Sequence, residues 1–341
     1  MPVTKIDDLG DIKLYEHSPS KPWTPLSRAA KTALASASLQ GIETLHVGQG
    51  DCTAVIAHKD DDPDGNSPIV VLYVDLGRAC GKCAKTFPGE DSTDTDRAPP
   101  TFDFTQKPKV LLTHWDKDHY YSALHEADAL TVDWMVPRQA VGPHVIRFIN
   151  RLSTVLCFPA TSPGKRFPLT TSPDVDLWIE VSKGATGSQT GDKNLTGLSF
   201  TLVRKDAAGD EVERIVLTGD APYQFVPSLS GGNPSAPGCP ICCLHAFHHG
   251  SKTHLPSTTD PVSLPQAKEY EVVFTYGLTA AGVNNFHHPA QEAMDYYKNK
   301  GWLERVNTAS AEPTTTDCTP ATSGQAPKTG GPRRSFFSRT S

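Results

Sequence analysis

The chain has 341 residues, eight of them cysteine, and a formal net charge of −6 at pH 7. This length can bury the core of one large domain or two ordinary ones, and so few cysteines cannot form a disulfide scaffold. The acidic balance argues against a broadly basic nucleic-acid-binding surface, although not against a nucleic acid substrate. No leader-like segment opens the chain, and no run approaches the ~18 apolar residues of a spanning helix. The sequence therefore predicts a soluble, cytoplasmic protein with no membrane contact.

Residues 1–40 are expected to form an extension that packs on the main domain and includes a short helix at Leu26–Ser38. From Gly41 onward, short β-rich runs alternate with helical patterns, which predicts a layered α/β domain over residues 41–306. Residues 307–341 are rich in Thr, Ser, Pro and Gly and are expected to be a disordered tail, with four basic and two acidic residues. The expected strands are Ile42–Val47, Thr53–His58, Ile69–Asp75, Val110–His114, Leu198–Val203, Val212–Thr218, Cys242–Phe247 and Val272–Tyr276, and the expected helices are Tyr120–Ala129, Val145–Leu156 and Ala290–Lys300.

The strongest chemical signal follows the apolar run that begins at Val110. It ends in Thr113-His-Trp-Asp-Lys-Asp-His119, which packs four potential metal ligands into six residues. His114 and Asp116 are two residues apart and can project in one direction from an extended chain, whereas Asp118 and His119 lie where the chain turns. A lone His is often structural and a lone Asp-x-Asp is usually a solvated turn. Four ligand types at this density after a buried strand instead indicate a metal centre.

This segment resembles the metallo-β-lactamase superfamily, whose signature is His-x-His-x-Asp-His at the end of a strand, here with Asp116 in the second His position. That variant is similar to the hydrolase domain of the ComEC competence proteins, and the similarity extends over about Gly41 to Lys300. It implies an αββα sandwich. Five further segments resemble the family in order: Leu45-His-Val-Gly-Gln-Gly-Asp51, Val71-Leu-Tyr-Val-Asp-Leu-Gly77, Val216-Leu-Thr-Gly-Asp220, His248-His-Gly-Ser251 and Asn284-Asn-Phe-His-His-Pro289.

The resemblance implies a centre of two divalent ions. It assigns His114 and Asp116 to one ion, Asp118 and His119 to the other, and Asp220 to a bridging position between them. Two such ions can bind and orient a hydroxide at neutral pH, so that no separate strong base is needed. Because a carboxylate replaces one imidazole, Mn²⁺ becomes a stronger alternative to Zn²⁺, and either ion fits. Asp118 and Asp220 are therefore expected to be catalytic as well as metal-binding.

The remaining implied positions are less determined. Asp75 is expected to support the ligands from behind. One of His248 and His249 completes the second ion's shell, and Gly250 slightly favours His249. His288 is a candidate ligand or substrate contact with a catalytic role.

Two departures from the family pattern bear on the site. Tyr120 stands where relatives have a small residue, so it could narrow the cleft or contact the substrate. Asn194 stands near the position of the superfamily's middle His ligand, so the first ion could have fewer protein ligands. Lys252, beside the His-His-Gly-Ser segment, could contact a phosphate or could be an ordinary surface residue.

Cys80-Gly-Lys-Cys83 and Cys239-Pro-Ile-Cys242 each have the spacing of a structural zinc ligand pair or a redox pair. A shared four-Cys zinc site is one interpretation of these pairs. Ordinary thiols are the more frequent outcome for such spacings.

Three functions fit the sequence. The first is a metal-dependent phosphodiesterase or nuclease with a dimetal-activated hydroxide, which the ComEC resemblance implies. The second is a hydrolase of small esters, lactones or thioesters. The third is a non-catalytic, metal-stabilised interaction module, against which the six ligand-bearing segments argue. The sequence identifies no protein partner.

Overall fold

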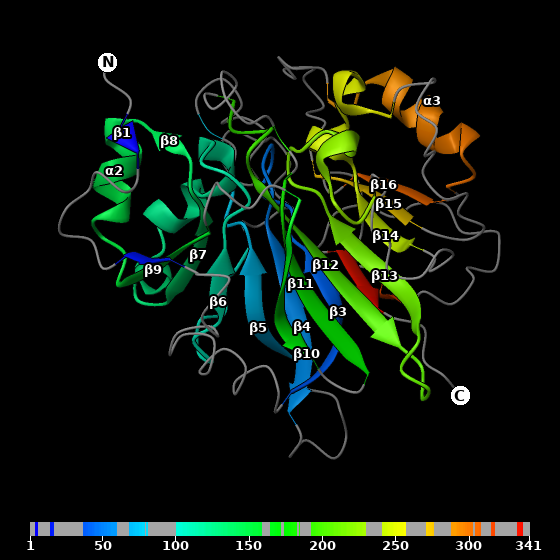
Figure 1. The fold of residues 1–341 in the computed structure, drawn as a ribbon, viewed down its shortest axis with the longest axis horizontal. Coiled ribbons are helices and arrows are strands. Elements are labelled where there is room, and N and C mark those ends of the chain that lie inside the picture. The colour runs from blue at the N-terminus through cyan, green and yellow to red at the C-terminus, as the bar shows by residue number, and fades with distance from the viewer. Residues whose placement is uncertain are drawn as a thin grey trace.

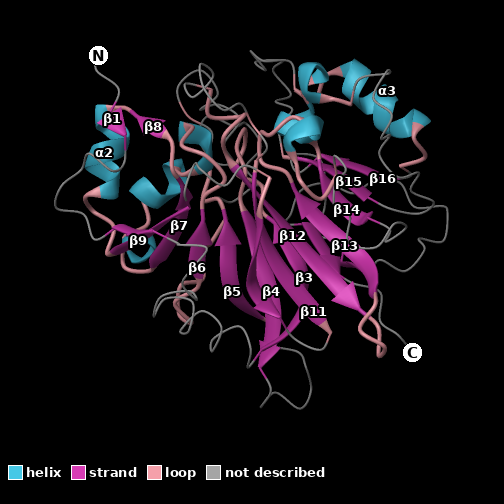
Figure 2. Cartoon of the chain, viewed as in Figure 1, coloured by secondary structure: helices cyan, strands magenta, loops and turns pink. Residues whose placement is uncertain are grey.

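The computed structural model describes residues 4–5, 14–16, 37–59, 68–78, 80, 100–158, 164–171, 174–182, 184, 192–229, 241–256, 271–275, 288–302, 304–307, 315–317 and 333–336. Two large mixed sheets form most of this part of the chain (Figure 1), with short helices at the outside (Figure 2). A two-stranded pair, β1 (Thr4–Lys5) with β8 (Ala140–Val141), adds to them.

The first sheet begins with an antiparallel meander and continues with parallel strands. Strands β3, β4 and β5 pair antiparallel, whereas β5, β6, β7, β9 and β2 run parallel to one another. The strand order is β17 (Thr315–Asp317), β18 (Arg333–Phe336), β3 (Ala37–Thr44), β4 (Thr53–Lys59), β5 (Ile69–Val74), β6 (Lys109–Leu111), β7 (Asp133–Pro137), β9 (Thr154–Phe158) and β2 (Leu14–Glu16).

The second sheet repeats the same plan. Strands β10 to β13 pair antiparallel in chain order, and β13 to β16 run parallel. Its strands are β10 (Arg166–Thr171), β11 (Val175–Val181), β12 (Leu198–Lys205), β13 (Glu211–Leu217), β14 (Ile241–His245), β15 (Glu271–Phe274) and β16 (Glu304–Asn307).

Alternate side chains of the strands enter two different cores, and this alternation creates the layers. In β5, Leu72 and Val74 belong to the core between the two sheets, whereas Tyr73 belongs to the core on the outer face of the first sheet. Phe148 of helix α2 (Pro143–Ile149) packs in that outer core, and Tyr297 of helix α3 (Gln291–Asn299) packs on the outer face of the second sheet. Figure 1 shows α2 beside β7 and β9 at one side of the molecule and α3 beside β16 at the other. The predicted αββα sandwich of the α/β class is confirmed.

Two of the helix predictions were wrong. Val145–Leu156 is helical only to Ile149, and β9 begins at Thr154, because Thr154-Val-Leu-Cys-Phe158 is a buried β-branched and aromatic run. Tyr120–Ala129 forms the 3₁₀ turns η4 (Tyr121–Leu124) and η5 (Asp128–Leu130) instead of one helix.

The ends of the chain add strands that the sequence analysis did not predict. Ala37 and Ser38 lie in β3, whereas residues 26–36 of the expected helix lie outside the described residues. In the segment expected to be disordered, β17 and β18 pair with each other and β18 pairs with β3, so these two segments differ from that expectation. The division at residues 40 and 306 stays a prediction. Within the described part of the chain, no helix has the length and apolar character needed to cross a membrane.

Candidate metal centre

The predicted ligands gather where strands of both sheets end at one edge. Asp75 follows β5 and His114 follows β6, its parallel neighbour in the first sheet. Asp220 follows β13 and His248 follows β14, a parallel pair in the second sheet. Parallel strands end at the same edge, where open α/β sheets place their ligands. Segments far apart in the sequence therefore meet at one point.

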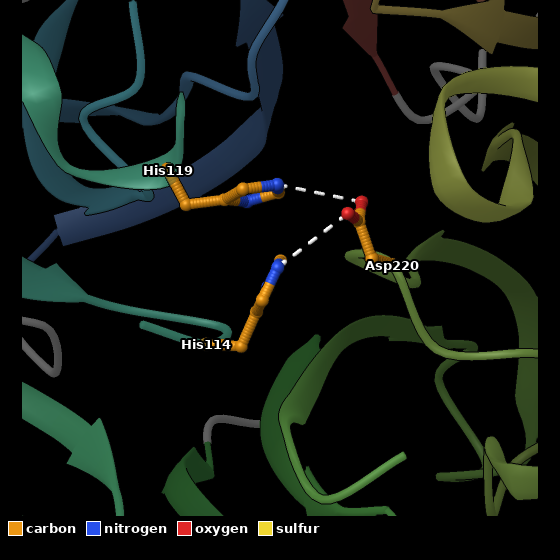
Figure 3. Close-up of side chains that lie close together, drawn as sticks. All are labelled: His114, His119 and Asp220. Carbon is orange, nitrogen blue, oxygen red and sulfur yellow. Dashed lines mark ion pairs between the residues drawn. The ribbon is translucent and has the colours of Figure 1, made fainter. Parts of the chain in front are cut away.

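Asp220 lies at the middle of the cluster, and each of its two oxygens faces two imidazoles. Its Oδ1 lies 3.4 Å from the Nε2 atoms of both His119 and His249. Its Oδ2 lies 3.4 Å from the Nε2 atoms of both His114 and His248. Figure 3 shows His114 and His119 approaching different oxygens of the same carboxylate. Asp220 is only 4% exposed, so this cluster is largely shielded from bulk water.

Tight turns bring these side chains together. Gly219 has φ 53°, and a Cβ atom there would lie 2.8 Å from the Cβ of Thr113, so only glycine allows the ends of β13 and β6 to approach this closely. His248 and His249 have φ 45° and 53°, a backbone conformation that residues other than glycine rarely adopt. Strained backbone of this kind is concentrated at functional sites, where the surrounding structure maintains it.

The two imidazoles of the first sheet are held from behind through their Nδ1 atoms. Asp75 Oδ2 accepts from His119 Nδ1 at 2.8 Å and from the Thr113 hydroxyl at 2.7 Å, and Asp75 Oδ1 accepts from the Thr113 backbone N–H at 2.7 Å. The Thr113 hydroxyl oxygen also lies 3.2 Å from His114 Nδ1. When Nδ1 carries the proton, the lone pair of the ring is on Nε2, the atom that faces Asp220. Metal-ligating histidines have their tautomer fixed in this way by a hydrogen-bond acceptor at the other ring nitrogen.

The two imidazoles of the second sheet are anchored in the same way. His249 Nδ1 lies 2.9 Å from Thr275 Oγ1. His248 Nδ1 lies 3.2 Å from His254 Nε2 and 3.4 Å from Asn194 Nδ2. All four histidines therefore direct Nε2 inward and Nδ1 outward.

Two further carboxylates approach the Oδ1 side of Asp220. Asp118 Oδ2 lies 3.7 Å from His249 Nε2, consistent with its predicted place beside His119. Asp51 Oδ1 lies 3.8 Å from His249 Nδ1, and Asp51 Oδ2 lies 4.0 Å from His119 Nδ1. Asp51 has no role predicted from the sequence, although it is the last residue of the Leu45–Asp51 segment that resembles the family. The Gly77 backbone N–H donates to the Asp51 carbonyl at 2.8 Å and fixes this turn against the centre.

Asp116 has a second partner that the sequence did not indicate. Its Oδ2 lies 3.5 Å from His114 Nε2, but its Oδ1 forms an ion pair with Lys193 Nζ at 2.5 Å. Lys193 Nζ also donates to the Trp115 carbonyl at 2.9 Å, and Gln139 links the two segments by accepting from Trp115 N and donating to the Lys193 carbonyl. Asp116 therefore shares its charge between His114 and a lysine ammonium.

When no ion is bound, the electrostatics of the cluster favour a charged Asp220 carboxylate and protonated imidazoles at His119 and His249. Burial alone would raise the pKa of Asp220, but the surrounding histidines outweigh it and hold the pKa well below the usual range. Burial alone would lower the pKa of His119, yet Asp220 and Asp75 raise it well above 6.5. Likewise, burial is outweighed at His249, where Asp220 and Asp51 raise the pKa to about 9. Protons thus occupy positions that a cation could take.

The donor atoms fit a divalent cation. His114 Nε2, His119 Nε2, Asp220 Oδ1 and Asp51 Oδ1 are buried, and no hydrogen-bond partner of good geometry serves them among the described residues. Unsatisfied buried polar atoms are costly, so their convergence calls for a bound group. Three-donor sets lie with all ligand atoms within 4.8 Å of one another. These sets are His114–His119–Asp220, Asp118–His119–His249, Asp51–Asp220–His249 and Asp51–Asp75–His119. Imidazole and carboxylate donors in this arrangement match Zn²⁺ or Mn²⁺.

Two predicted substrate contacts have other partners in the structure. Tyr120 is 4% exposed and stacks on Phe148 with ring centroids 5.0 Å apart, so its ring packs in the outer core, and its contact with a substrate stays a prediction. Lys252 Nζ pairs with Glu292 Oε1 at 2.9 Å on the surface, with 59% of the Lys252 side chain exposed. Its contact with a phosphate stays a prediction.

His288 lies at the rim of the cluster. Its ring centroid is 5.4 Å from that of His248. Burial, together with His249 and His248, lowers the pKa of His288 to about 3, so the ring is neutral at physiological pH. A neutral imidazole beside the centre can accept a hydrogen bond or contact a substrate, and its role as ligand or substrate contact stays a prediction. Residues 284–287 of its motif lie outside the described residues.

The four-Cys zinc site also stays a prediction. Cys83 and Cys239 lie outside the described residues. Cys242 is buried in β14 within the core between the sheets.

No family model and no curated protein matches the chain. Two solved structures are similar to it in fold. Zn²⁺-bound PqqB from Methylobacterium extorquens is 12% identical and has a TM-score of 0.36, with 75% of this chain and 85% of that chain covered. The metallo-β-lactamase fold protein YhfI from Bacillus subtilis is 11% identical and has a TM-score of 0.34, with 78% of this chain and 96% of that chain covered. Likeness at this level carries no conclusion about the reaction, and the narrower resemblance to ComEC stays a prediction.

Proposed function

We propose that the chain is a divalent-metal-dependent hydrolase and that its substrates are phosphodiesters. The observation that carries the proposal is the convergence of four imidazole Nε2 atoms on the two oxygens of Asp220, each at 3.4 Å. A purely structural cluster would satisfy its own hydrogen bonds, whereas His114 Nε2 and His119 Nε2 have no partner of good geometry among the described residues.

The residues that would hold an ion on the Oδ1 side of Asp220 are His119, His249 and Asp118. On the Oδ2 side, His114 and Asp116 are the predicted ligands. Divalent ions at such a centre supply Lewis-acid polarisation of the scissile group and activation of water at neutral pH.

The protein's own residues provide orientation and charge balance. Asp75 holds the His119 ring and fixes its tautomer through the 2.8 Å contact at Nδ1. Thr275 does the same for His249 at 2.9 Å. Lys193 balances the charge of Asp116, and burial of Asp220 keeps bulk water from screening the centre.

Phosphodiesters are the substrate class that the ligand set favours. Asp116, Asp118 and Asp220 make the donor set rich in hard oxygen, which suits the ions that accompany phosphoryl chemistry. Paired ions can clamp the attacking and leaving oxygens of an in-line displacement. The resemblance of the Val110–His119 segment to the ComEC hydrolase domain supports the same substrate class. Small esters, lactones and thioesters are the competing substrates.

The test is hydrolysis by purified protein reconstituted with Zn²⁺ or Mn²⁺. The substrates are bis(p-nitrophenyl) phosphate, single-stranded DNA and a panel of lactones and thioesters. We expect phosphodiester cleavage that is lost in Asp220→Asn and retained in Asp206→Asn, an exposed turn carboxylate that accepts the Ala208 and Asp210 backbone N–H groups. Lactone cleavage without phosphodiester cleavage would refute phosphodiesters as the substrate class and favour small esters and lactones. Absence of hydrolysis of every substrate with both ions would refute the proposed hydrolase function.

A further inference from the structure

The His248-His249 pair presents both of its imidazoles to one carboxylate. Consecutive side chains of an extended strand point to opposite faces. Here both residues have positive φ, 45° and 53°, and the resulting turn directs both Nε2 atoms at Asp220. The two contacts fall on different oxygens, so the pair straddles the carboxylate.

Each oxygen of Asp220 therefore has one imidazole from each sheet. On Oδ1, His119 comes from the first sheet and His249 from the second. On Oδ2, His114 comes from the first sheet and His248 from the second. Each side of Asp220 therefore has two imidazole Nε2 atoms, and all four lie 3.4 Å from the nearer oxygen.

His248 is also anchored as a ligand would be. Its Nδ1 lies 3.2 Å from His254 Nε2, which can accept a hydrogen bond from the Nδ1–H group of His248. Asn194 Nδ2 lies 3.4 Å from the same Nδ1 atom, and Asn194 Oδ1 is buried with no hydrogen-bond partner among the described residues. Exchange of the amide oxygen and nitrogen, which have nearly the same shape, would give His248 Nδ1 a second acceptor.

Asp116 is less available than His248 on this side. Its Oδ1 is engaged by Lys193, and 41% of its side chain is exposed. Lys193 is itself fixed by the Trp115 carbonyl at 2.9 Å, so the ion pair is part of a rigid arrangement. A cation beside His114 therefore competes with an ammonium for Asp116, whereas no lysine or arginine among the described residues pairs with His248.

We propose that His248 and His249 are both metal ligands, and that His248 belongs with His114 to the ion on the Oδ2 side of Asp220. This inference rests on the proposed function. It adds His248 to the ligands of the ion on the Oδ2 side of Asp220. Each of the two consecutive histidines then binds a different ion. Asn194 and His254 are then positioning residues that act through His248.

The experiment measures Zn²⁺ and Co²⁺ binding to the full chain by equilibrium dialysis and titration calorimetry. We compare wild type with His248→Ala, His249→Ala and His144→Ala, an exposed histidine of α2. We expect about two equivalents for wild type and His144→Ala, since the ligands form two sets. In His248→Ala one site should weaken by about 10-fold or more while the other is retained, and His249→Ala should show the reverse pattern.

A second measurement needs no variant and covers a failure of His248→Ala to fold. In ¹⁵N-histidine-labelled wild-type protein, the Nε2 resonances of four imidazoles should shift on Zn²⁺ addition, with one pair saturating before the other.

The outcomes separate the inference from the function on which it rests. Wild-type protein that binds neither ion would refute the proposed function. If wild type binds two equivalents and His248→Ala binds both within threefold of the wild-type affinities, the role of His248 is overturned and the hydrolase stands. Binding of one equivalent only, or a His248 Nε2 resonance unmoved by saturating Zn²⁺, also overturns it.

Discussion

Replacing Asp75 tests whether the centre depends on a carboxylate that touches no substrate. Asp75 is fully buried and accepts three hydrogen bonds: two from Thr113, at 2.7 Å each, and one from His119 Nδ1 at 2.8 Å. Asp75→Asn keeps the shape but replaces one acceptor with an NH₂ donor. One buried donor then loses its acceptor, which costs about 1–3 kcal/mol of unfolding free energy. Asp75→Ala strands both the Thr113 N–H and the His119 Nδ1–H, and should cost about 2–6 kcal/mol.

The same change should weaken metal binding. Outer partners of metal-bound histidines contribute about 10–100-fold in affinity, which is about 1.4–2.7 kcal/mol. We expect Asp75→Asn to lower Zn²⁺ affinity by that factor in a competition assay with a chromogenic chelator, and to lower the urea midpoint of the metal-free protein. Asp206→Asn, in the exposed β12–β13 turn, is the matched control and should change neither quantity. Zn²⁺ affinity within threefold of wild type in a folded Asp75→Asn variant would refute the argument that Asp75 orients His119.

Three further predictions concern the turn at Gly250, the pH dependence and Tyr120. Gly250→Ala should lower the melting temperature and the metal affinity, because Gly250 has φ 92° and a Cβ atom there would lie 2.7 Å from Phe274 Cδ1. Gly209 is the control, because it has a similar φ of 87° but no atom within contact of an added Cβ. Gly209→Ala should therefore cost only the backbone strain, about 1 kcal/mol. Nearby carboxylates outweigh the effect of burial and raise the pKa of His249 from 6.5 to about 9. The stability that protonated His249 contributes to the metal-free protein is therefore complete below pH 6.5 and is lost as the pH rises through 9. Metal affinity should rise over the same window, and a pH-independent affinity between pH 6 and 9 would contradict this. Tyr120→Phe should retain both activity and stability, and a large loss of activity alone would restore its predicted substrate role.

The part of the candidate site that the sequence could predict is the part whose residues are close together in the chain. The run from His114 to His119 follows a buried strand, and a pattern of that density is visible without any knowledge of the fold. The partners that complete the site come from distant segments. Asp51 meets His249 only because the β3–β4 turn and the end of β14 lie at the same edge. Lys193 reaches Asp116 through a loop whose path the sequence did not specify.

The error in the helix predicted at Val145–Leu156 has a physical cause. Strand β9 is buried on both faces, as parallel strands are, so it lacks the alternation that identifies a half-buried strand. The continuous apolar pattern from Val145 onward was therefore interpreted as one helix. In the same way, the place of Tyr120 beside the ligands in the sequence does not tell which way its ring points. Packing against Phe148 decides this, and Phe148 belongs to a helix on the outer face of the sheet.

We propose that Asp220 holds divalent ions between imidazoles of the two sheets. Anomalous diffraction at the zinc absorption edge from crystals of the Zn²⁺-loaded protein would locate these ions. We expect a peak on each side of the Asp220 carboxylate, one in contact with His119 and His249 and the other with His114, at the ~2.0–2.2 Å of zinc–nitrogen and zinc–oxygen bonds. Fully loaded crystals with no anomalous peak in contact with Asp220 would contradict it.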